Sequence, residues 1–245
     1  MKYPAPLQSG RLLRRYKRFF ADVELDSGEV VTAHCPNTGA LTGLTSPGLR
    51  VWLSYQNNPK RKLQWTWEQV ETPGGFRVGV HTHRANQLIE EALNDGPLAR
   101  KFPGTLHREV KLGESRIDFL IEGEQKWLIE VKSVTLGPLY PPPGLGYFPD
   151  AKSVRATKHL QSLIQHQQKG HQSVLIFCVQ HSGIRMVAPA AHIDPDYAQW
   201  LTKAHAQGVQ LIALGCELDE AHICASHQLP VTLVADPDHN AFVSR

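Results

Sequence analysis

Two neighbouring segments of the chain, residues 115–122 and 126–133, alternate apolar and polar side chains. This alternation is typical of β-strands that bury one face. The three residues between the segments, 123–125, are polar and suit a tight connection. The two segments therefore predict a β-hairpin, and its register decides which side chains lie opposite one another.

The predicted hairpin brings three charged side chains together. Side chains two positions apart share a face of a strand, so Glu130 and Lys132 share one face of the second strand. A three-residue connection centred on Glu124 places Asp118 directly across from Glu130. The opposite, apolar faces are expected to consist of Ile117, Phe119, Ile121, Trp127, Ile129 and Val131. Two carboxylates and an ammonium group should then converge on one patch.

The chemistry of that patch depends on whether it is solvated or buried. A salt-bridged hairpin with a solvated outer face is the ordinary alternative. The second strand, however, is strongly apolar on both sides of Glu130, which predicts a central, buried strand. A buried carboxylate is costly unless it is paired or bound to a metal. The pattern therefore favours a hard divalent cation with a water molecule beside it.

The composition excludes some classes of protein. With 245 residues, of which 41% are apolar and 20% charged, the chain is expected to be soluble, with one large domain or two small ones. It has no run of about eighteen apolar residues and no apolar secretory core at its N-terminus, so we expect no membrane association. Four scattered cysteines without a Cys-x-x-Cys pair indicate a reduced, cytoplasmic setting. Cys216, Cys224 and His227 can be drawn as a zinc site, but no fourth ligand is evident.

Positive charge is concentrated at the N-terminal end. The net charge is +3, yet residues 1–82 carry 11 Lys and Arg against 6 Asp and Glu, a net of +5, and the remainder carries 15 against 17, a net of −2. A basic part joined to a carboxylate-bearing part indicates electrostatic capture of a polyanion. A modest basic bias without consequence is the alternative.

The first domain, residues 1–82, is expected to be a small β-barrel of the OB type, because about five short strands and their turns fit into it. Basic residues interleaved with aromatic ones suit a nucleic acid, since charges bind phosphates and rings stack on bases. For most of the aromatic residues, among them Tyr16, Phe19, Trp65 and Trp67, a place in the barrel core is favoured instead. The basic candidates for nucleic-acid binding here are Arg11, Arg14, Arg15, Lys17, Arg18, Lys60, Arg61 and Lys62.

The second domain, residues 83–245, is expected to be of the α/β class, because predicted strands alternate with predicted helices. Thr82 is expected to cap the first helix. The expected helices are 84–94, with an apolar stripe of Ala85, Leu88, Ile89, Ala92 and Leu93, then one that starts at Asp150 or Ser153 and runs to about residue 168, and 197–206. The expected strands after the hairpin are 174–179 and a final central strand, 209–214. The Pro- and Gly-rich segment 137–149 is too irregular for an element and can lie over a site.

Asp118, followed after eleven residues by Glu-x-Lys on a hairpin behind a helix, resembles the motif of the PD-(D/E)xK nuclease superfamily. A closer resemblance is to the sugar fermentation stimulation protein A (SfsA) family. The stretches that carry it span nearly the whole chain: RFFADV (18–23), HCPNTG (34–39), NQLIEEAL (86–93), REV (108–110), DF (118–119), EVKSVTL (130–136), FPDA (148–151) and KHL (158–160). The Pro-rich segment 139–147 departs from the pattern expected of the family.

The SfsA resemblance implies an N-terminal OB-like domain followed by a PD-(D/E)xK restriction-endonuclease-like domain with a mixed sheet. It also implies DNA binding and a link to the regulation of sugar (maltose) metabolism. The implied DNA binding agrees with the basic first domain.

The hairpin residues support metal-assisted phosphodiester hydrolysis. Asp118 and Glu130 are expected to ligate Mg²⁺ or Mn²⁺ through oxygen, with the Val131 carbonyl and waters completing an octahedron. Such an ion polarises the phosphate and lowers the pKa of bound water. Lys132 would orient that water or stabilise the developing charge. Further candidates are Glu91 and Glu109 as outer carboxylates and Arg155 and Lys158 as phosphate contacts, with a solvated surface charge as the alternative for each.

Three hypotheses follow. The first is a DNA-binding protein with a Mg²⁺- or Mn²⁺-dependent nuclease site, and the second is a non-catalytic DNA-binding transcriptional regulator that retains a nuclease-like fold. The third is processing of RNA or another phosphodiester, because an OB-like barrel does not by itself distinguish DNA from RNA. Contacts dominated by phosphates predict sequence-nonspecific DNA binding. The sequence leaves a homo-oligomer open.

Overall fold

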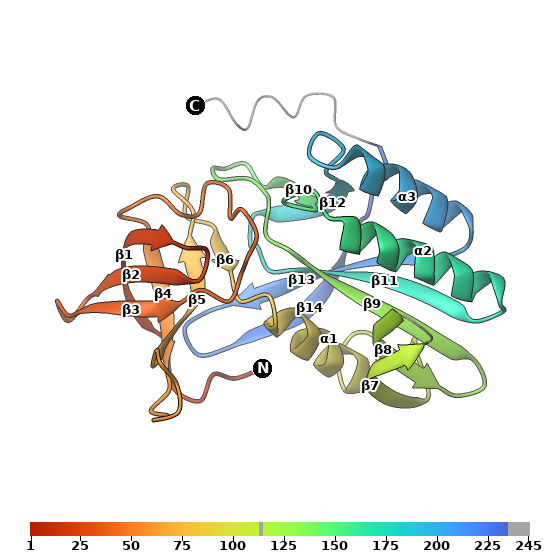
Figure 1. The fold of residues 1–245 in the computed structure, drawn as a ribbon, viewed down its shortest axis with the longest axis horizontal. Coiled ribbons are helices and arrows are strands. Elements are labelled where there is room, and N and C mark those ends of the chain that lie inside the picture. Colours follow the sequence, from red (N-terminus) through yellow and green to blue (C-terminus); the bar gives the residue numbers. More distant parts are fainter. Residues whose placement is uncertain (113–114, 235–245) are drawn as a thin grey trace.

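The computed structural model describes residues 1–112 and 115–234, apart from the side chain of Ser115. Figure 1 shows a small barrel built from the first third of the chain beside a larger sheet that carries helices on both faces. No helix in the described ranges is both long and apolar enough to cross a lipid bilayer.

The barrel has five strands in the order β3-β2-β1-β4-β5 and closes through a pairing of β3 with β5. These strands are β1 (Gln8–Tyr16), β2 (Phe20–Leu25), β3 (Val30–His34), β4 (Arg50–Tyr55) and β5 (Trp65–Glu71), and β6 (Arg77–Gly79) extends the sheet beyond β5. The predicted OB-like barrel is thus confirmed. Trp67 is fully buried in its core, as expected, whereas Phe19 is 46% exposed and does not belong to it.

The second domain is built on a six-stranded mixed sheet. In spatial order its strands are β14 (Ile223–Leu229), β13 (Gln210–Leu218), β11 (Gln172–Val179), β9 (Lys126–Val134), β8 (Ser115–Glu122) and β7 (Thr105–Leu112). The three central strands β9, β11 and β13 run parallel, and the flanking pairings are antiparallel. Buried on both sides, β11 is apolar along nearly its whole length, which is why the sequence predicted it so readily.

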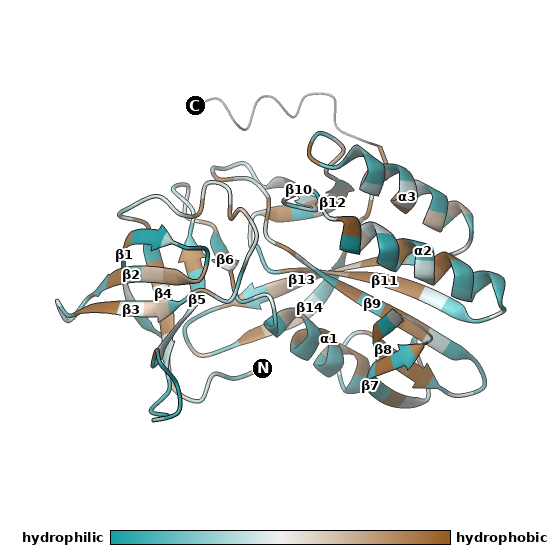
Figure 2. Ribbon diagram, viewed as in Figure 1, coloured by the Kyte–Doolittle hydropathy of each residue, from teal (hydrophilic) through white to brown (hydrophobic). Residues whose placement is uncertain are grey.

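Helices cover both faces of this sheet. Helix α1 (Arg84–Asn94) buries its predicted stripe on one face, where Leu88 and Ile89 lie in one core with Ile129 and Ile176. Helices α2 (Val154–Gln168) and α3 (Pro195–Ala206) cover the other face. Figure 2 shows the apolar residues concentrated on the central strands, while the helices alternate apolar and polar bands.

Several sequence expectations were wrong in detail. Thr82 does not cap α1: its hydroxyl donates to the Pro36 carbonyl at 2.8 Å, and His83 occupies the N-cap position without a side-chain hydrogen bond. The expected final central strand is β13, but the sequence did not predict β14, which follows it at the edge of the sheet. The segment 137–149 contains a strand, β10 (Gly144–Phe148), which pairs in parallel with β12 (Ile184–Pro189).

Strand β10 escaped prediction because glycine disfavours strands. Here the glycine is required by packing. A β-carbon at Gly146 would lie 2.4 Å from the Ile184 side chain of the neighbouring strand. The close approach of the two strands therefore selects a residue that weakens the local strand signal.

Buried polar contacts fix the barrel to the second domain. Glu68 of β5 is 1% exposed and accepts hydrogen bonds from Arg84 of α1 at 2.9 Å and from Ser54 at 2.8 Å. The Gln69 side chain donates to the Asp219 carbonyl at 2.9 Å. A buried carboxylate without its cation would be costly, so this junction favours one relative placement of the two domains.

Candidate functional site

The hairpin of β8 and β9 has the predicted connection. Its paired residues run from Glu122 opposite Lys126 to Phe119 opposite Ile129, with residues 123–125 between the strands. The pairing ends at Phe119, so Asp118, the residue that precedes it in the chain, has no partner in this ladder. Instead of a ladder contact there, the Val131 N–H donates to Asp118 Oδ2 at 2.8 Å. The two strands therefore separate where the two predicted ligands lie.

The separation also changes which way β8 faces. Phe119 and Ile121 lie in the core beneath α1, as expected, but Ile117 lies with Leu128 in the core beneath α2. The expectation that Ile117 shares a face with Phe119 was wrong, because the strand turns once it has left its partner. As a result, Asp118 reaches α1, where Asn86 donates to its Oδ1 at 2.8 Å.

Glu130 lies in the middle of the sheet, 2% exposed, and faces α2. Its Oε1 accepts a hydrogen bond from Lys132 Nζ at 2.6 Å and contacts His159 Nδ1 of α2. Lys132 Nζ is also 3.1 Å from His159 Nδ1. The carboxylate, the ammonium group and the imidazole therefore form one compact cluster around Oε1.

The pKa values of the two carboxyl groups are shifted in opposite directions. Burial and the nearby charge of Glu130 raise the pKa of Asp118, against the opposing effects of the Val131 N–H and Asn86. Burial acts to raise the pKa of Glu130 as well, but the His159 hydrogen bond and the Lys132 charge outweigh it, and the pKa is lowered. Two coupled carboxyl groups thus divide into an ionised member and one that retains its proton more readily.

Asp118, Val131 and Lys132 open onto a cleft of about 760 Å³ between the two domains. The barrel contributes Arg18 and the turn 37–39 to its lining. The remaining walls come from the start of α1, from Arg108 and Glu109 of β7, and from residues 147–153 with Arg155. The Pro- and Gly-rich segment therefore borders the site through its C-terminal end.

Two of the predicted basic residues, Arg18 and Arg155, line this cleft, and Lys152 joins them. Arg15 does not: its guanidinium donates to four backbone carbonyls, those of Arg18, Asn37, Gly39 and Ala40. Its role is to hold the barrel turn, which corrects the expectation of a phosphate contact.

The other basic candidates lie outside the cleft lining. Arg11 donates to the Gly48 carbonyl, Arg14 pairs with Asp22, and Arg61 donates to Gln56 and Thr66. The remaining members of this group are Lys17, Lys60, Lys62 and Lys158.

The two outer carboxylates differ. Glu109 lines the cleft, where it pairs with Arg116 at 3.0 Å. Glu91 does not line the cleft, because it lies on an exposed part of α1 and pairs with the N-terminal amine of Met1 at 2.5 Å. Its inclusion among the metal-site residues is therefore corrected.

Sequence reasoning missed three residues of the site, Asn86, His159 and Asp150. Asn86 and His159 border the buried stripes of their helices, and a polar residue at such a border is a usable signal once the helix is known to face the carboxylates. Asp150 accepts hydrogen bonds from the backbone N–H groups of Ala40 and Leu41, so it binds the barrel turn to the wall of the cleft.

The zinc set that the sequence allowed, Cys216, Cys224 and His227, does not form. Cys216 is buried in the core beneath α1, with its Sγ 3.7 Å from that of Cys178. Cys224, in contrast, pairs across β13 and β14 with Glu217 on the other face.

The comparison with known proteins agrees with this architecture. Residues 83–222 match the family model described as the sugar fermentation stimulation protein RE domain, and residues 13–80 match the SfsA N-terminal OB domain. The chain belongs to the sugar fermentation stimulation protein family. A homolog in Shewanella sp. (strain ANA-3) is 49% identical over 236 residues, which cover 94% of this chain and 99% of the relative. A second, in Shewanella loihica (strain ATCC BAA-1088 / PV-4), is 48% identical over 239 residues, covering 95% and 100%.

A solved SfsA structure has the same overall arrangement. The Pyrococcus furiosus SfsA in complex with Ca²⁺ superimposes with a TM-score of 0.81 at 26% sequence identity. The match covers 95% of this chain and 98% of the archaeal one. Both domains of this SfsA family member therefore have their counterparts in that structure.

The contact between Asp150 and the barrel turn yields a first prediction. A β-carbon at Gly39 would lie 2.1 Å from Asp150 Oδ2, so Gly39→Ala should displace the carboxylate from the Ala40 and Leu41 N–H groups. Leu41 is buried, and leaving a buried N–H group unpaired costs about 1–3 kcal/mol. We expect a lower thermal unfolding midpoint, measured by differential scanning calorimetry. Gly144→Ala is the control, because a β-carbon there meets only an ordinary contact at 3.7 Å; equal midpoints for the two variants would contradict the prediction.

Proposed function

We propose that this protein binds DNA in the cleft between its domains and hydrolyses phosphodiester bonds with Mg²⁺ or Mn²⁺. The observation that carries the proposal is the Asp118 carboxylate in a cleft edged by Lys132, Arg18 and Arg155, with the buried Glu130 close enough behind it for its charge to raise the pKa of Asp118. This arrangement fits the metal-binding motif of PD-(D/E)xK nucleases, which the sequence resembles.

The residues fit a hard divalent cation. The donors are oxygens of Asp118 and Glu130, the ligand type that Mg²⁺ and Mn²⁺ prefer. The raised pKa of Asp118, due to burial and then to the Glu130 charge, marks a place where added positive charge would be favourable. The archaeal SfsA was solved in complex with Ca²⁺, which is another oxygen-seeking cation.

The chain's own groups then have distinct roles. When bound, the ion would polarise the phosphate and make water more acidic. Asn86 and the Val131 N–H hold the Asp118 carboxylate in place. His159 and Lys132 keep Glu130 ionised, and Lys132 carries a positive charge to the edge of the cleft, where charge develops on a phosphate under attack.

The second candidate is a non-catalytic DNA-binding regulator. The family's name refers to stimulation of sugar fermentation rather than to cleavage, which favours regulation of sugar metabolism through DNA. Such a protein would use the same cleft with the carboxylates as an architectural remnant. The third hypothesis, RNA or another phosphodiester as the substrate, is tested by the cleavage assay described next.

The catalytic proposal predicts that Glu130→Gln loses cleavage of double- or single-stranded DNA by at least about 100-fold, because one anionic ligand is removed. Purified protein would be assayed on DNA and RNA with Mg²⁺, Mn²⁺ or chelator. Glu91→Gln, an exposed carboxylate outside the cleft, is the matched control and should cleave normally. Absence of cleavage by the parent protein with either metal, together with retained DNA binding, would favour the regulator.

The DNA-binding proposal predicts that a double variant, Arg18→Glu with Arg155→Glu, weakens binding of unrelated DNA sequences alike. The slope of affinity against salt should become shallower by about one for each phosphate that the variant no longer neutralises. Fluorescence anisotropy over a salt series measures both effects. Lys60→Glu, also a charge reversal but outside the cleft lining, should have little effect. A larger effect of Lys60→Glu would indicate that DNA binds on the outer face of the barrel and not in the cleft.

The contact of His159 with Glu130 predicts a pH effect. His159 lowers the pKa of Glu130, so in His159→Leu that pKa should rise, and ionised Glu130 should be lost at a higher pH than in the parent. We expect the pH at which half of the Mn²⁺ binding is lost to increase, measured by calorimetric titration. His166→Leu, on the same helix, is the control. An unshifted pH midpoint would show that His159 does not tune this carboxylate.

A further inference from the structure

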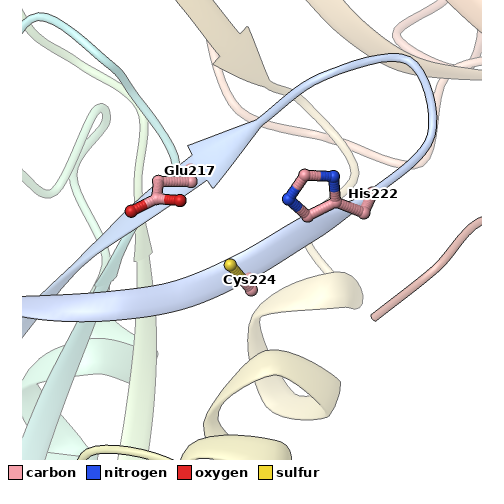
Figure 3. A group of neighbouring side chains, drawn as sticks. All are labelled: Glu217, His222 and Cys224. Carbon is pink, nitrogen blue, oxygen red and sulfur yellow. The ribbon is translucent and has the colours of Figure 1, made fainter.

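A second cluster of metal-ligand side chains lies at the far end of the sheet, on the hairpin of β13 and β14. Glu217 and Cys224 lie directly opposite each other in the ladder, so their side chains share a face. His222, from the turn, completes the group, and the ligand atoms of the three residues lie within 4.8 Å of one another. Figure 3 shows the carboxylate, the imidazole and the thiol facing one another.

The imidazole of His222 is oriented by a neighbouring carboxylate. Asp219 Oδ2 lies 2.6 Å from His222 Nδ1, and Figure 3 shows the other ring nitrogen directed toward Glu217 and Cys224. Asp219 is itself fixed, because its Oδ1 accepts the N–H groups of Ala221 and His222, both at 2.7 Å. A carboxylate that fixes the far nitrogen of a histidine is the usual outer partner of a metal-bound imidazole.

We propose that Glu217, His222 and Cys224 bind a zinc-class divalent ion at this hairpin. A set of one oxygen, one nitrogen and one sulfur ligand suits Zn²⁺, whereas Mg²⁺ and Ca²⁺ prefer oxygen alone. Three protein ligands leave the fourth tetrahedral position for water. Glu217 is exposed and the other two residues are half-buried, so their side chains have room to close on an ion.

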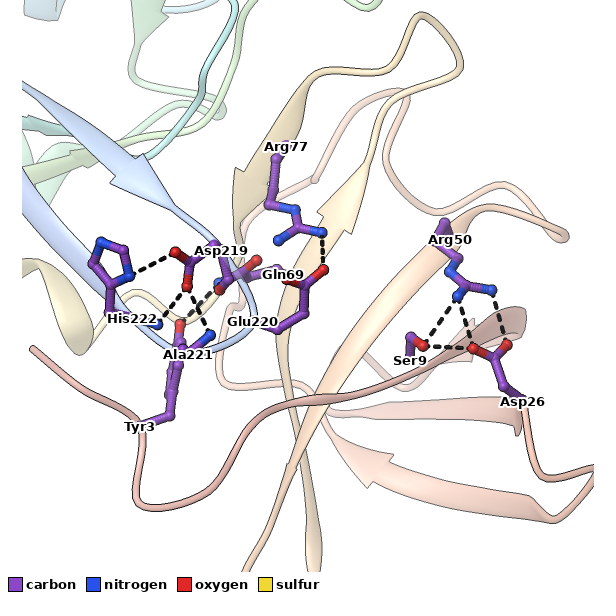
Figure 4. Close-up of polar contacts among 10 residues, drawn as sticks. All are labelled: Tyr3, Ser9, Asp26, Arg50, Gln69, Arg77, Asp219, Glu220, Ala221 and His222. Carbon is purple, nitrogen blue, oxygen red and sulfur yellow. Dashed lines mark hydrogen bonds and ion pairs between the residues drawn. The ribbon is translucent and has the colours of Figure 1, made fainter.

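The position of the cluster indicates what the ion would do. The turn between the two strands contacts the barrel, where Arg77 pairs with Glu220 at 2.8 Å, as Figure 4 shows. It also contacts the N-terminal segment, since the N–H groups of Tyr3 and Leu7 donate to the carbonyls of Ala221 and Glu220. An ion that fixes this turn would therefore stabilise the junction of both domains, without taking part in chemistry at Asp118.

Titration of the purified full-length protein with Co²⁺ tests the proposal, because a thiolate bound to Co²⁺ gives a charge-transfer absorption that oxygen ligands alone do not give. The parent should show one saturable site with this band, and Zn²⁺ should displace it. Cys224→Ser should lose the band, and His222→Gln and Glu217→Gln should weaken binding at least about 100-fold. Asp219→Asn, which alters only the outer partner, should weaken it about 10–100-fold.

Two control variants separate the alternatives. Cys216→Ala removes the buried thiol beside Cys178 and should leave the band intact. Asp118→Asn alters the proposed nuclease centre and should also leave it intact, so the two proposals fail independently. A second readout is the thermal midpoint, which Zn²⁺ should raise in the parent and not in Cys224→Ser. Absence of a thiolate band, or a band that persists in Cys224→Ser, would overturn the proposal.

Discussion

The hydrogen bond from the Val131 N–H to the Asp118 carboxylate is the contact on which the candidate site depends. Strand β8 pairs with β9 only from Phe119 onward, so the N–H of Val131 on β9 has no acceptor in the ladder with β8. Buried N–H groups are rarely left unpaired. Asp118 provides the acceptor. The same bond holds the carboxylate close enough to Glu130 for their charges to interact. Strand separation therefore creates both the opening of the sheet and the paired carboxylates within it.

The barrel completes the site rather than standing apart from it. Its turn 37–39 and Arg18 form one wall of the cleft, and Arg15 and Asp150 hold that turn from two sides through backbone groups. Arg15 thus supports the position of Arg18, although both were expected to contact phosphate. The donors of Arg15 are taken up by backbone carbonyls, whereas Arg18 lines the cleft and is available to a ligand.

Patterns of local sequence predicted much of the fold and the centre of the site. Alternation identified the hairpin and with it Asp118, Glu130 and Lys132, and the helical stripe from Ala85 to Leu93 was found buried as expected. What failed depended on contacts between distant segments. The turn of β8 at Ile117, the strand around Gly146 and the partners Asn86 and His159 follow from which elements meet in space. The spacing of residues along one strand or helix does not reveal which other elements that strand or helix contacts.

The two proposed metal centres differ in donor atoms and in position. This difference suggests a catalytic role for one and a structural role for the other. Asp118 offers carboxylate oxygens to a cleft lined with basic residues, and Glu130 lies buried behind it, so a hard cation held there would meet a phosphate. Glu217, His222 and Cys224 offer three different donor atoms at a turn of the second domain that contacts the barrel. Since the cleft is walled by both domains, its shape depends on the junction. A zinc-class ion at the turn would therefore preserve the geometry that the oxygen site requires.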